Sequence, residues 1–105
     1  MEMKKRYKNK KHLQYIHTLN CSVSNVDCNG PIQAHHLLKP FDGARGMGMK
    51  ASDKNLVPLC VYHHRELHKM GNEFKFSLKY FGIYNQLQYI AQTFWLRSPA
   101  YEKVE

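Results

Sequence analysis

The chain has 105 residues and a formal net charge of +8 at pH 7. Its length predicts one domain with a modest core, and in so small a domain a bound metal often supplements hydrophobic burial. No run of about 20 apolar residues predicts a membrane span, and no apolar segment follows the basic N-terminus as in a secretory signal. Three cysteines fit a reducing compartment better than a disulfide framework, so we expect a cytoplasmic protein.

Positive charge is concentrated in residues 1–12, where six cations stand against Glu2 alone. A segment with this charge repels itself and suits a polyanion, so we expect a disordered basic arm that contacts nucleic acid. A solubilising tail is the alternative, whereas a membrane-surface role would need an apolar face that the segment lacks. The six cations are Lys4, Lys5, Arg6, Lys8, Lys10 and Lys11.

The next part of the chain predicts a short helix, a loop, a strand and a second loop. Residues 13–19 place apolar side chains at helical spacing, and residues 20–31 are rich in Cys, Ser, Asn, Gly and Pro, which are typical of loops. Residues 32–38 are typical of a strand. Residues 41–54 contain three glycines and no periodicity, and a loop of this length in a compact domain usually serves a function.

A second strand and a helix are predicted after the long loop. Residues 55–60 form a short apolar run in which Pro58 favours an edge or a strand end. Residues 61–70 contain good helix formers and are followed by Gly71, a typical C-cap.

The last third of the chain is predicted to be helical. We expect a short helical segment over residues 73–80 and an amphipathic helix over residues 84–96. The apolar side chains that recur at three- and four-residue intervals in this second helix are Tyr84, Leu87, Ile90, Ala91, Phe94 and Trp95.

Three cysteines and one histidine provide the donors of a zinc site. Thiolate and imidazole are the preferred zinc ligands, and a closed structural site needs four of them. Cys60 and His63 have the Cys-x-x-His spacing, and Cys21 and Cys28 supply the other two ligands at a gap wider than in zinc fingers. The alternative is that Cys60 is a small buried apolar residue.

A second group of histidines predicts another metal site. His64 and His68 are four residues apart, which places both on one face of a helix. A further ligand can come from the adjacent pair His35 and His36. Neighbouring side chains of a strand point to opposite faces, so only one of that pair should face the site unless a bulge intervenes.

The residues His35-His36, Asn55-Leu-Val-Pro-Leu-Cys60 and His63-His64 together resemble the HNH nuclease motif. The resemblance covers residues 21 to about 70. It implies an α+β fold with a small ββα-metal core over about 31–71, within a single nuclease domain of residues 13–105 whose C-terminal helical extension covers 73–97. The stretch Gly46-Met-Gly-Met-Lys-Ala-Ser-Asp53 is similar to phage recombination-associated nucleases of the Ref type, which would place the protein in the host cytoplasm.

The resemblance also implies a role for each motif residue. His36 matches the general base, and Asn55 matches the central asparagine that fixes the loop and orients that base. His35 and His64 match metal ligands, and His68 matches an extra histidine found in bacteriocin DNases. The zinc-containing members have two Cys-x-x-Cys pairs where this chain has Cys21, Cys28, Cys60 and His63, so the chain departs from them in its first spacing and in its fourth ligand.

The function implied is that of a metal-dependent HNH endonuclease that hydrolyses DNA phosphodiester bonds with Mg²⁺ or a similar divalent ion, beside a structural Zn²⁺. Arg45, Lys50 and Lys54 lie in the long loop, where they are either phosphate contacts or solvated charges. One alternative function is that of a non-catalytic, zinc-stabilised DNA-binding module. Another is that of an RNA-directed nuclease with the same core.

Overall fold

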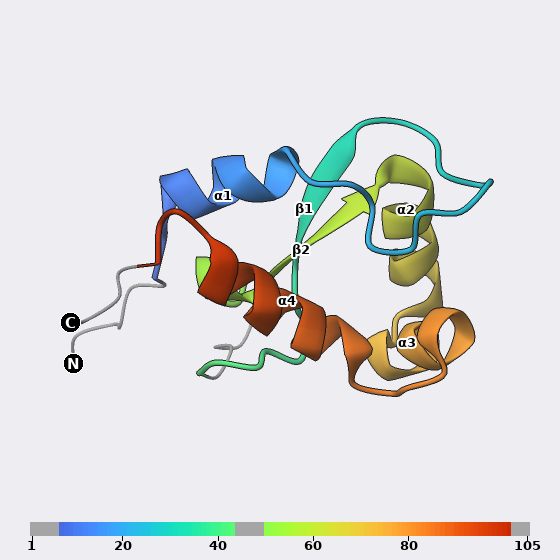
Figure 1. Cartoon of the computed structure of the whole chain (residues 1–105). Helices are drawn as coiled ribbons and strands as arrows, with labels where there is room; N and C mark the ends of the chain where they lie inside the picture. The colour runs from blue at the N-terminus through green and yellow to red at the C-terminus, as the bar shows by residue number, and fades with distance from the viewer. Residues whose placement is uncertain (1–6, 44–49, 102–105) are drawn as a thin grey trace.

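The computed structural model describes residues 7–43 and 50–101 of the chain. Within these residues the protein has an α+β fold. Two strands form a small antiparallel sheet, and four α-helices and one 3-10 helix surround it (Figure 1). In chain order the elements are α1 (Lys10–His17), β1 (Ile32–His36), η1 (Asp53–Asn55), β2 (Leu56–Cys60), α2 (Val61–Met70), α3 (Glu73–Phe81) and α4 (Gln86–Arg97).

The sheet is a two-stranded antiparallel hairpin that is covered on both sides by helices. Its register is regular and runs from Ile32 opposite Cys60 to His36 opposite Leu56. In Figure 1, α1 and α2 lie on opposite sides of the strands, and each helix contacts both strands. Every residue of β2 is buried, as expected of a strand with helices on both faces. Pro58 pairs with Ala34 at the middle of this hairpin.

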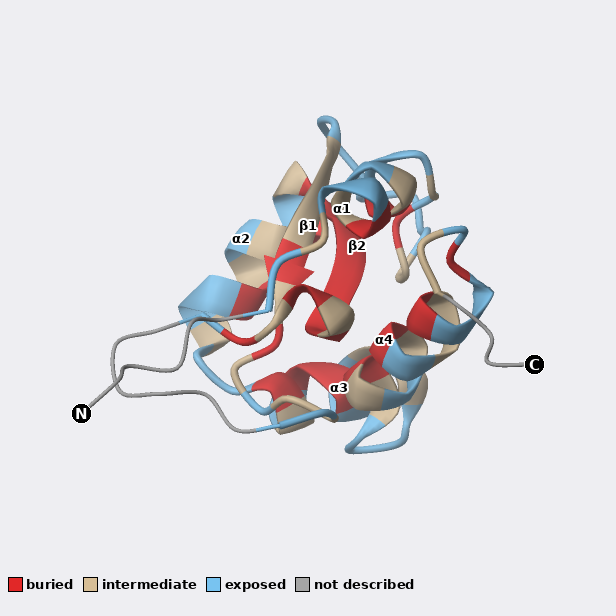
Figure 2. Ribbon diagram, turned by 90° about the vertical axis from the view of Figure 1, so that its left-hand side faces the viewer, coloured by how far each residue is buried: buried red, intermediate tan, exposed pale blue. Residues whose placement is uncertain are grey.

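The core fills the space between β2 and the last three helices. Leu59, Leu67, Phe76 and Leu87 belong to it and are fully or almost fully buried. Figure 2 shows the buried positions gathered on β2 and on the inward faces of α3 and α4. Burial of four such side chains stabilises the fold by roughly 1.5–3 kcal/mol each. The core therefore holds the hairpin against α2 and fixes the position of the residues on both.

Helix α2 has the bounds that the sequence predicts, because its two ends are capped. The sulfur of Cys60 accepts a hydrogen bond from the backbone N–H of His63 at the N-terminus. At the C-terminus Gly71 has φ = 63°, a left-handed conformation that costs glycine least, and its N–H bonds the carbonyl of Leu67. The expected C-cap is thus confirmed.

The expectation of a disordered arm through residue 12 is wrong for residues 7–12. Helix α1 already begins at Lys10, because the side chain of Asn9 caps it by accepting a hydrogen bond from the N–H of His12. The carbonyl of Tyr7 in turn accepts a hydrogen bond from the N–H of Asp53, which ties this segment to η1. The predicted cations Lys4, Lys5 and Arg6 lie outside the described residues.

Other element bounds differ from the predictions by a few residues. Strand β1 ends at His36 instead of residue 38, and the long loop ends earlier than predicted because Asp53 already belongs to η1. Helix α4 begins at Gln86, and Tyr84, which the periodicity places on its apolar face, is exposed. Trp95, by contrast, is only 9% exposed and packs inward as predicted. Within the part of the chain that the structure describes, no helix has the length and apolar character that a membrane span requires.

Candidate metal centres

The four predicted zinc ligands come together at one end of the hairpin. Cys21 and Cys28 belong to the loop between α1 and β1, Cys60 ends β2, and His63 lies in the first turn of α2. Nδ1 of His63 is 3.6 Å from the sulfur of Cys21, 3.6 Å from that of Cys28 and 3.1 Å from that of Cys60. All four donor atoms lie within 4.8 Å of one another. We call this group the Cys3His cluster.

The chemistry of the Cys3His cluster fits a metal such as zinc. Three sulfurs and one imidazole nitrogen make up the four donors of a closed tetrahedral site. Burial disfavours the thiolate of Cys60, but the backbone N–H groups of His63 and Asn29 and the His63 side chain outweigh it and lower the pKa of this thiol to about 6. A thiol that is already ionised near neutral pH is a ready metal ligand.

A second group of donors lies on the side of the hairpin that α2 covers. His35 comes from β1, and His64 and His68 come from consecutive turns of α2. Nε2 of His64 is 3.2 Å from Nδ1 of His35 and 3.1 Å from Nε2 of His68. His35 is buried, His64 is half-buried and His68 is exposed, so this histidine triad opens to solvent at His68.

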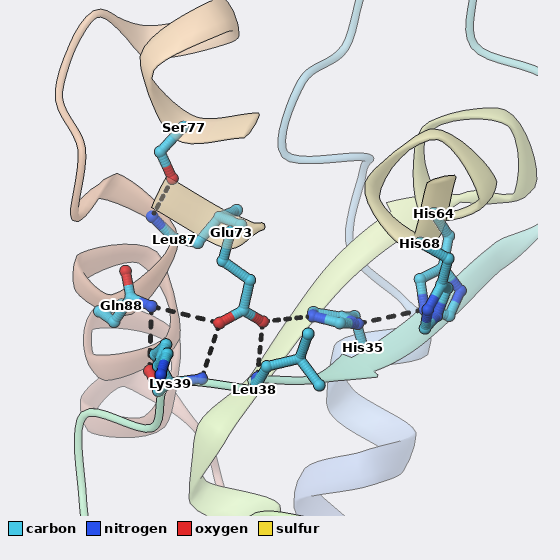
Figure 3. A network of polar contacts seen from close by, with 9 residues as sticks. All are labelled: His35, Leu38, Lys39, His64, His68, Glu73, Ser77, Leu87 and Gln88. Atoms are coloured by element: carbon cyan, nitrogen blue, oxygen red, sulfur yellow. Dashed lines mark hydrogen bonds and ion pairs between the residues drawn. The ribbon is translucent and has the colours of Figure 1, made fainter. Parts of the chain in front are cut away.

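A buried carboxylate contacts His35 at the ring nitrogen that does not face His64 (Figure 3). Oε2 of Glu73 lies 2.7 Å from Nε2 of His35, and Glu73 is only 2% exposed. The same carboxylate accepts hydrogen bonds from the backbone N–H groups of Leu38 (2.6 Å) and Lys39 (2.8 Å), and from the amide of Gln88 (3.4 Å). The two backbone N–H groups and the amide all donate, so the Glu73 carboxylate is the acceptor at the centre of this network.

These contacts orient two rings. The bond between Nε2 of His35 and Glu73 directs Nδ1 of His35 toward His64. His64 donates from Nδ1 to the side-chain oxygen of Gln33 at 2.6 Å, which leaves a lone pair on Nε2. Nδ1 of His35 and Nε2 of His64 therefore face each other across 3.2 Å, a spacing in which one cation can lie near both. Burial, together with the neighbouring His35 and His68, lowers the pKa of His64 to about 4, so this ring is neutral near pH 7, as a metal ligand must be.

His36 points away from the histidine triad. The regular pairing of β1 with β2 contains no bulge, so the side chains of His35 and His36 leave the strand on opposite faces. Nε2 of His36 lies 2.9 Å from Oδ1 of Asp53 in η1, and the other oxygen of Asp53 accepts a hydrogen bond from the backbone N–H of Asn9 at 2.8 Å. The structure thus pairs the predicted base with a carboxylate.

Asn55 organises the loop that precedes it. Its side-chain oxygen accepts hydrogen bonds from the backbone N–H groups of Phe41 (2.8 Å) and Asp42 (3.1 Å), and its amide donates to the carbonyl of Asp42 and the hydroxyl of Ser52. Its own carbonyl accepts the N–H of Leu37, directly after His36. The side chain of Asn55 therefore fixes the loop, as predicted, whereas Asp53 contacts the imidazole.

The predicted phosphate-binding cations are placed unequally. Lys54 lies 3.8 Å from a carboxylate oxygen of Asp42 and over the rings of Tyr7 and Trp95, so its charge is engaged within the molecule. Arg45 lies outside the described residues. Four of the predicted cations are exposed, namely Lys8, Lys10, Lys11 and Lys50.

Three residues at these sites were not predicted from the sequence. Glu73 and Gln33 contact metal-site histidines that lie far away in the chain, and no spacing signal connects them. Asp53 carried more signal, because it lies two residues before the motif asparagine in a stretch that contains few acids.

Comparison with known proteins places the chain in a family. A family described as "Protein of unknown function (DUF968)" matches residues 2–97. The chain belongs to this family. It is also similar to "Uncharacterized protein YdfU" of Escherichia coli (strain K12), with 35% identity over 65 residues. That similarity covers 62% of this chain but only 17% of YdfU, so the chain spans a small part of that relative. No solved structure matches the chain.

Proposed function

We propose that the protein is a metal-dependent HNH endonuclease that hydrolyses phosphodiester bonds of nucleic acid, with DNA as its substrate. The observation that carries the proposal is the convergence of three imidazole nitrogens, two of which belong to rings that Glu73 and Gln33 orient. Carboxylate-supported histidines are typical of protein metal sites. The order of hairpin and then helix supports the resemblance of the motif residues to the HNH nucleases.

The donor set bears on which metal the histidine triad would hold. Imidazole nitrogen suits transition metals such as Zn²⁺, Ni²⁺ or Co²⁺, whereas Mg²⁺ prefers oxygen ligands, so the three histidines favour a transition metal over the Mg²⁺ that the motif implies. Three protein ligands leave a position open for substrate. When bound, the ion would supply Lewis-acid stabilisation of the phosphate and of the leaving oxygen.

His36 is the proposed general base, and Asp53 is the residue that holds it. A carboxylate at Nε2 fixes the tautomer and stabilises the imidazolium that forms, so the proton taken from water goes to Nδ1. In an in-line displacement the attacking water and the leaving oxygen lie on opposite sides of phosphorus. His35 and His36 are adjacent at the C-terminal end of β1, so the ligand and the base belong to the same end of this strand.

The proposed role of the Cys3His cluster is structural. A zinc ion there would join the loop of Cys21 and Cys28 to the start of α2, and so hold the helix that carries His64 and His68. The same cluster also favours the second candidate function, a zinc-stabilised nucleic-acid-binding module without activity.

Nicking of a supercoiled plasmid by the zinc-loaded protein, with Zn²⁺, Ni²⁺, Co²⁺, Mn²⁺ and Mg²⁺ in parallel, tests the proposal. We expect metal-dependent nicking that His64→Ala abolishes and that His17→Gln, a change at an exposed histidine of α1, leaves intact. Binding without nicking under every metal would instead support the binding module. A matched RNA of the same sequence decides between DNA and RNA as the substrate.

A further inference from the structure

A surface groove runs along the outer side of α2. Its volume is about 980 Å³, and it lies between this helix and the loop residues Asn29 and Gly30. Tyr62, Arg65 and Lys69 line it from one stripe of the helix, since they are three and four residues apart. None of these three belongs to the metal centres described above.

The groove carries positive charge that is not neutralised within the described part of the chain. Arg65 and Lys69 are exposed, and neither forms an ion pair there. Glu66 also lines the groove, but its carboxylate is engaged by the Lys79 ammonium and the Tyr80 hydroxyl of α3. The two cations are therefore available to an anionic ligand.

An exposed aromatic ring stands beside these cations. Tyr62 is 45% exposed, although its backbone N–H is fixed by the carbonyl of Asn29. Cations that contact the backbone, together with an aromatic ring on which a base stacks, form the usual surface for a single nucleic-acid strand. A small metabolite would not need both features over a whole helical stripe.

The groove is continuous with the histidine triad, because His68 belongs to both. We propose that this groove binds a single strand of nucleic acid that flanks the cleaved bond, with Arg65 and Lys69 on its phosphates and Tyr62 stacked on a base. The inference rests on the proposed function in one respect, namely that a bond next to this strand is cleaved at the histidine triad. It locates binding on α2, away from the N-terminal arm and the long loop that the sequence indicates.

The charge contacts are tested with the double variant Arg65→Gln/Lys69→Gln. A labelled single-stranded DNA oligonucleotide is titrated with zinc-loaded protein over a series of salt concentrations, and fluorescence anisotropy gives the affinity. Because two cations stop displacing counterions, the slope of log K against log salt should fall in magnitude by about 1.4, and affinity at low salt should fall about tenfold. The control Lys75→Gln/Arg97→Gln removes the same charge from exposed positions on α3 and α4.

The stacking contact is tested with Tyr62→Ala and Tyr62→Phe. Loss of the ring should weaken binding of the same oligonucleotide about tenfold, while phenylalanine should restore it. Tyr89→Ala, at an exposed tyrosine of α4, is the control and should bind as the unchanged protein does.

The result separates this inference from the proposed function. If the groove variants lose affinity and the controls do not, the groove binds nucleic acid, even if no metal ever supports cleavage. If the unchanged protein cuts DNA but the groove and control variants bind alike, the inference is overturned and the proposed nuclease stands.

Discussion

Glu73 and His35 form a buried pair, 2.7 Å between Oε2 and Nε2, across 38 positions of the chain. Glu73 is the first residue of α3, so this pair joins the C-terminal helices to the face of β1 that carries the histidine triad. The helices after α2 therefore support the candidate site as well as the core. The consequences of this arrangement can be measured.

Glu73→Gln should weaken metal binding at the histidine triad. The amide keeps the shape but loses the anion that makes His35 a stronger ligand, and changes of this kind typically cost about 10–100-fold in affinity. Calorimetric titration of zinc-loaded protein with Co²⁺ measures it. Asp27→Asn, at an exposed carboxylate, is the matched control. Equal Co²⁺ affinity in both variants would show that Glu73 serves the fold alone.

Cys60→Ser should lose zinc and with it the fold, because the Cys3His cluster joins the loop of Cys21 and Cys28 to the junction of β2 and α2. Metal analysis and circular dichroism of the same sample check this. Val26→Ala, which changes a fully exposed side chain in the same loop, should retain one equivalent of zinc. A folded, unoxidised protein that contains no zinc would contradict the prediction.

Trp95→Ala should cost about 3–5 kcal/mol of the free energy of unfolding. The indole packs edge-on against His12, with ring centroids 5.0 Å apart, and against Tyr101 at 5.6 Å. Urea denaturation measures the loss, and Tyr89→Ala should change stability little because its ring is 62% exposed. Unchanged stability together with weaker DNA binding would make this aromatic cluster a binding surface.

The unfolding free energy should also depend on pH through His12. Burial lowers the pKa of this histidine to about 4 from 6.5, against a smaller opposing effect of Asp53, and neither ring nitrogen has a hydrogen-bond partner among the described residues. The unfolded chain thus binds the proton more readily. The stability that neutral His12 contributes is therefore fully present above pH 6.5. The free energy of unfolding should fall by about 2–3 kcal/mol as the pH drops to 4.

The variant His12→Phe isolates that effect, because the protonation of the metal ligands is common to both proteins. As the pH falls from 6.5 to 4, the free energy of unfolding of this variant, measured by urea denaturation, should rise steadily relative to that of the unchanged protein. His17→Gln, at an exposed histidine of the same helix, should show no such trend. A difference between His12→Phe and the unchanged protein that stays constant with pH would contradict the assignment.

The sequence predicts the hairpin, helix α2 and the residues of the Cys3His cluster and the histidine triad for identifiable reasons. Residues such as His64 and His68 lie one turn apart on a helix with clear caps, so local periodicity places them together. Glu73 cannot be found in this way, because its contacts with Leu38 and Lys39 form only when the start of α3 lies beside the chain that follows β1. Tertiary packing carries no signal in the spacing of residues.

The N-terminal segment shows the opposite case, in which a local signal was outweighed. Asn9 is a typical N-cap, yet the surrounding lysines favour disorder. The bonds of Tyr7 and Asn9 to Asp53 add tertiary support that composition does not reveal. The alternation of side chains along a strand, by contrast, correctly predicts that only one of His35 and His36 faces His64 and His68.

His36→Ala should reduce cleavage about 10²–10⁴-fold while DNA affinity and metal content stay unchanged, because a general base acts on the rate. Asp53→Asn should give a smaller loss and shift the pH profile of cleavage, since its amide no longer stabilises the imidazolium. Initial rates of plasmid nicking from pH 5 to 9 provide both results. Full activity of His36→Ala would assign proton removal to another group.

The most direct test of the histidine triad as the catalytic metal site measures Co²⁺ binding and plasmid nicking in the same titration. Co²⁺ is added to zinc-loaded protein, its absorption bands report binding, and plasmid nicking is measured at every point. We expect one equivalent to bind, nicking to rise in proportion, and both to be absent in His64→Ala. Nicking that persists in His64→Ala, or a filled site in the unchanged protein without nicking, would contradict the account.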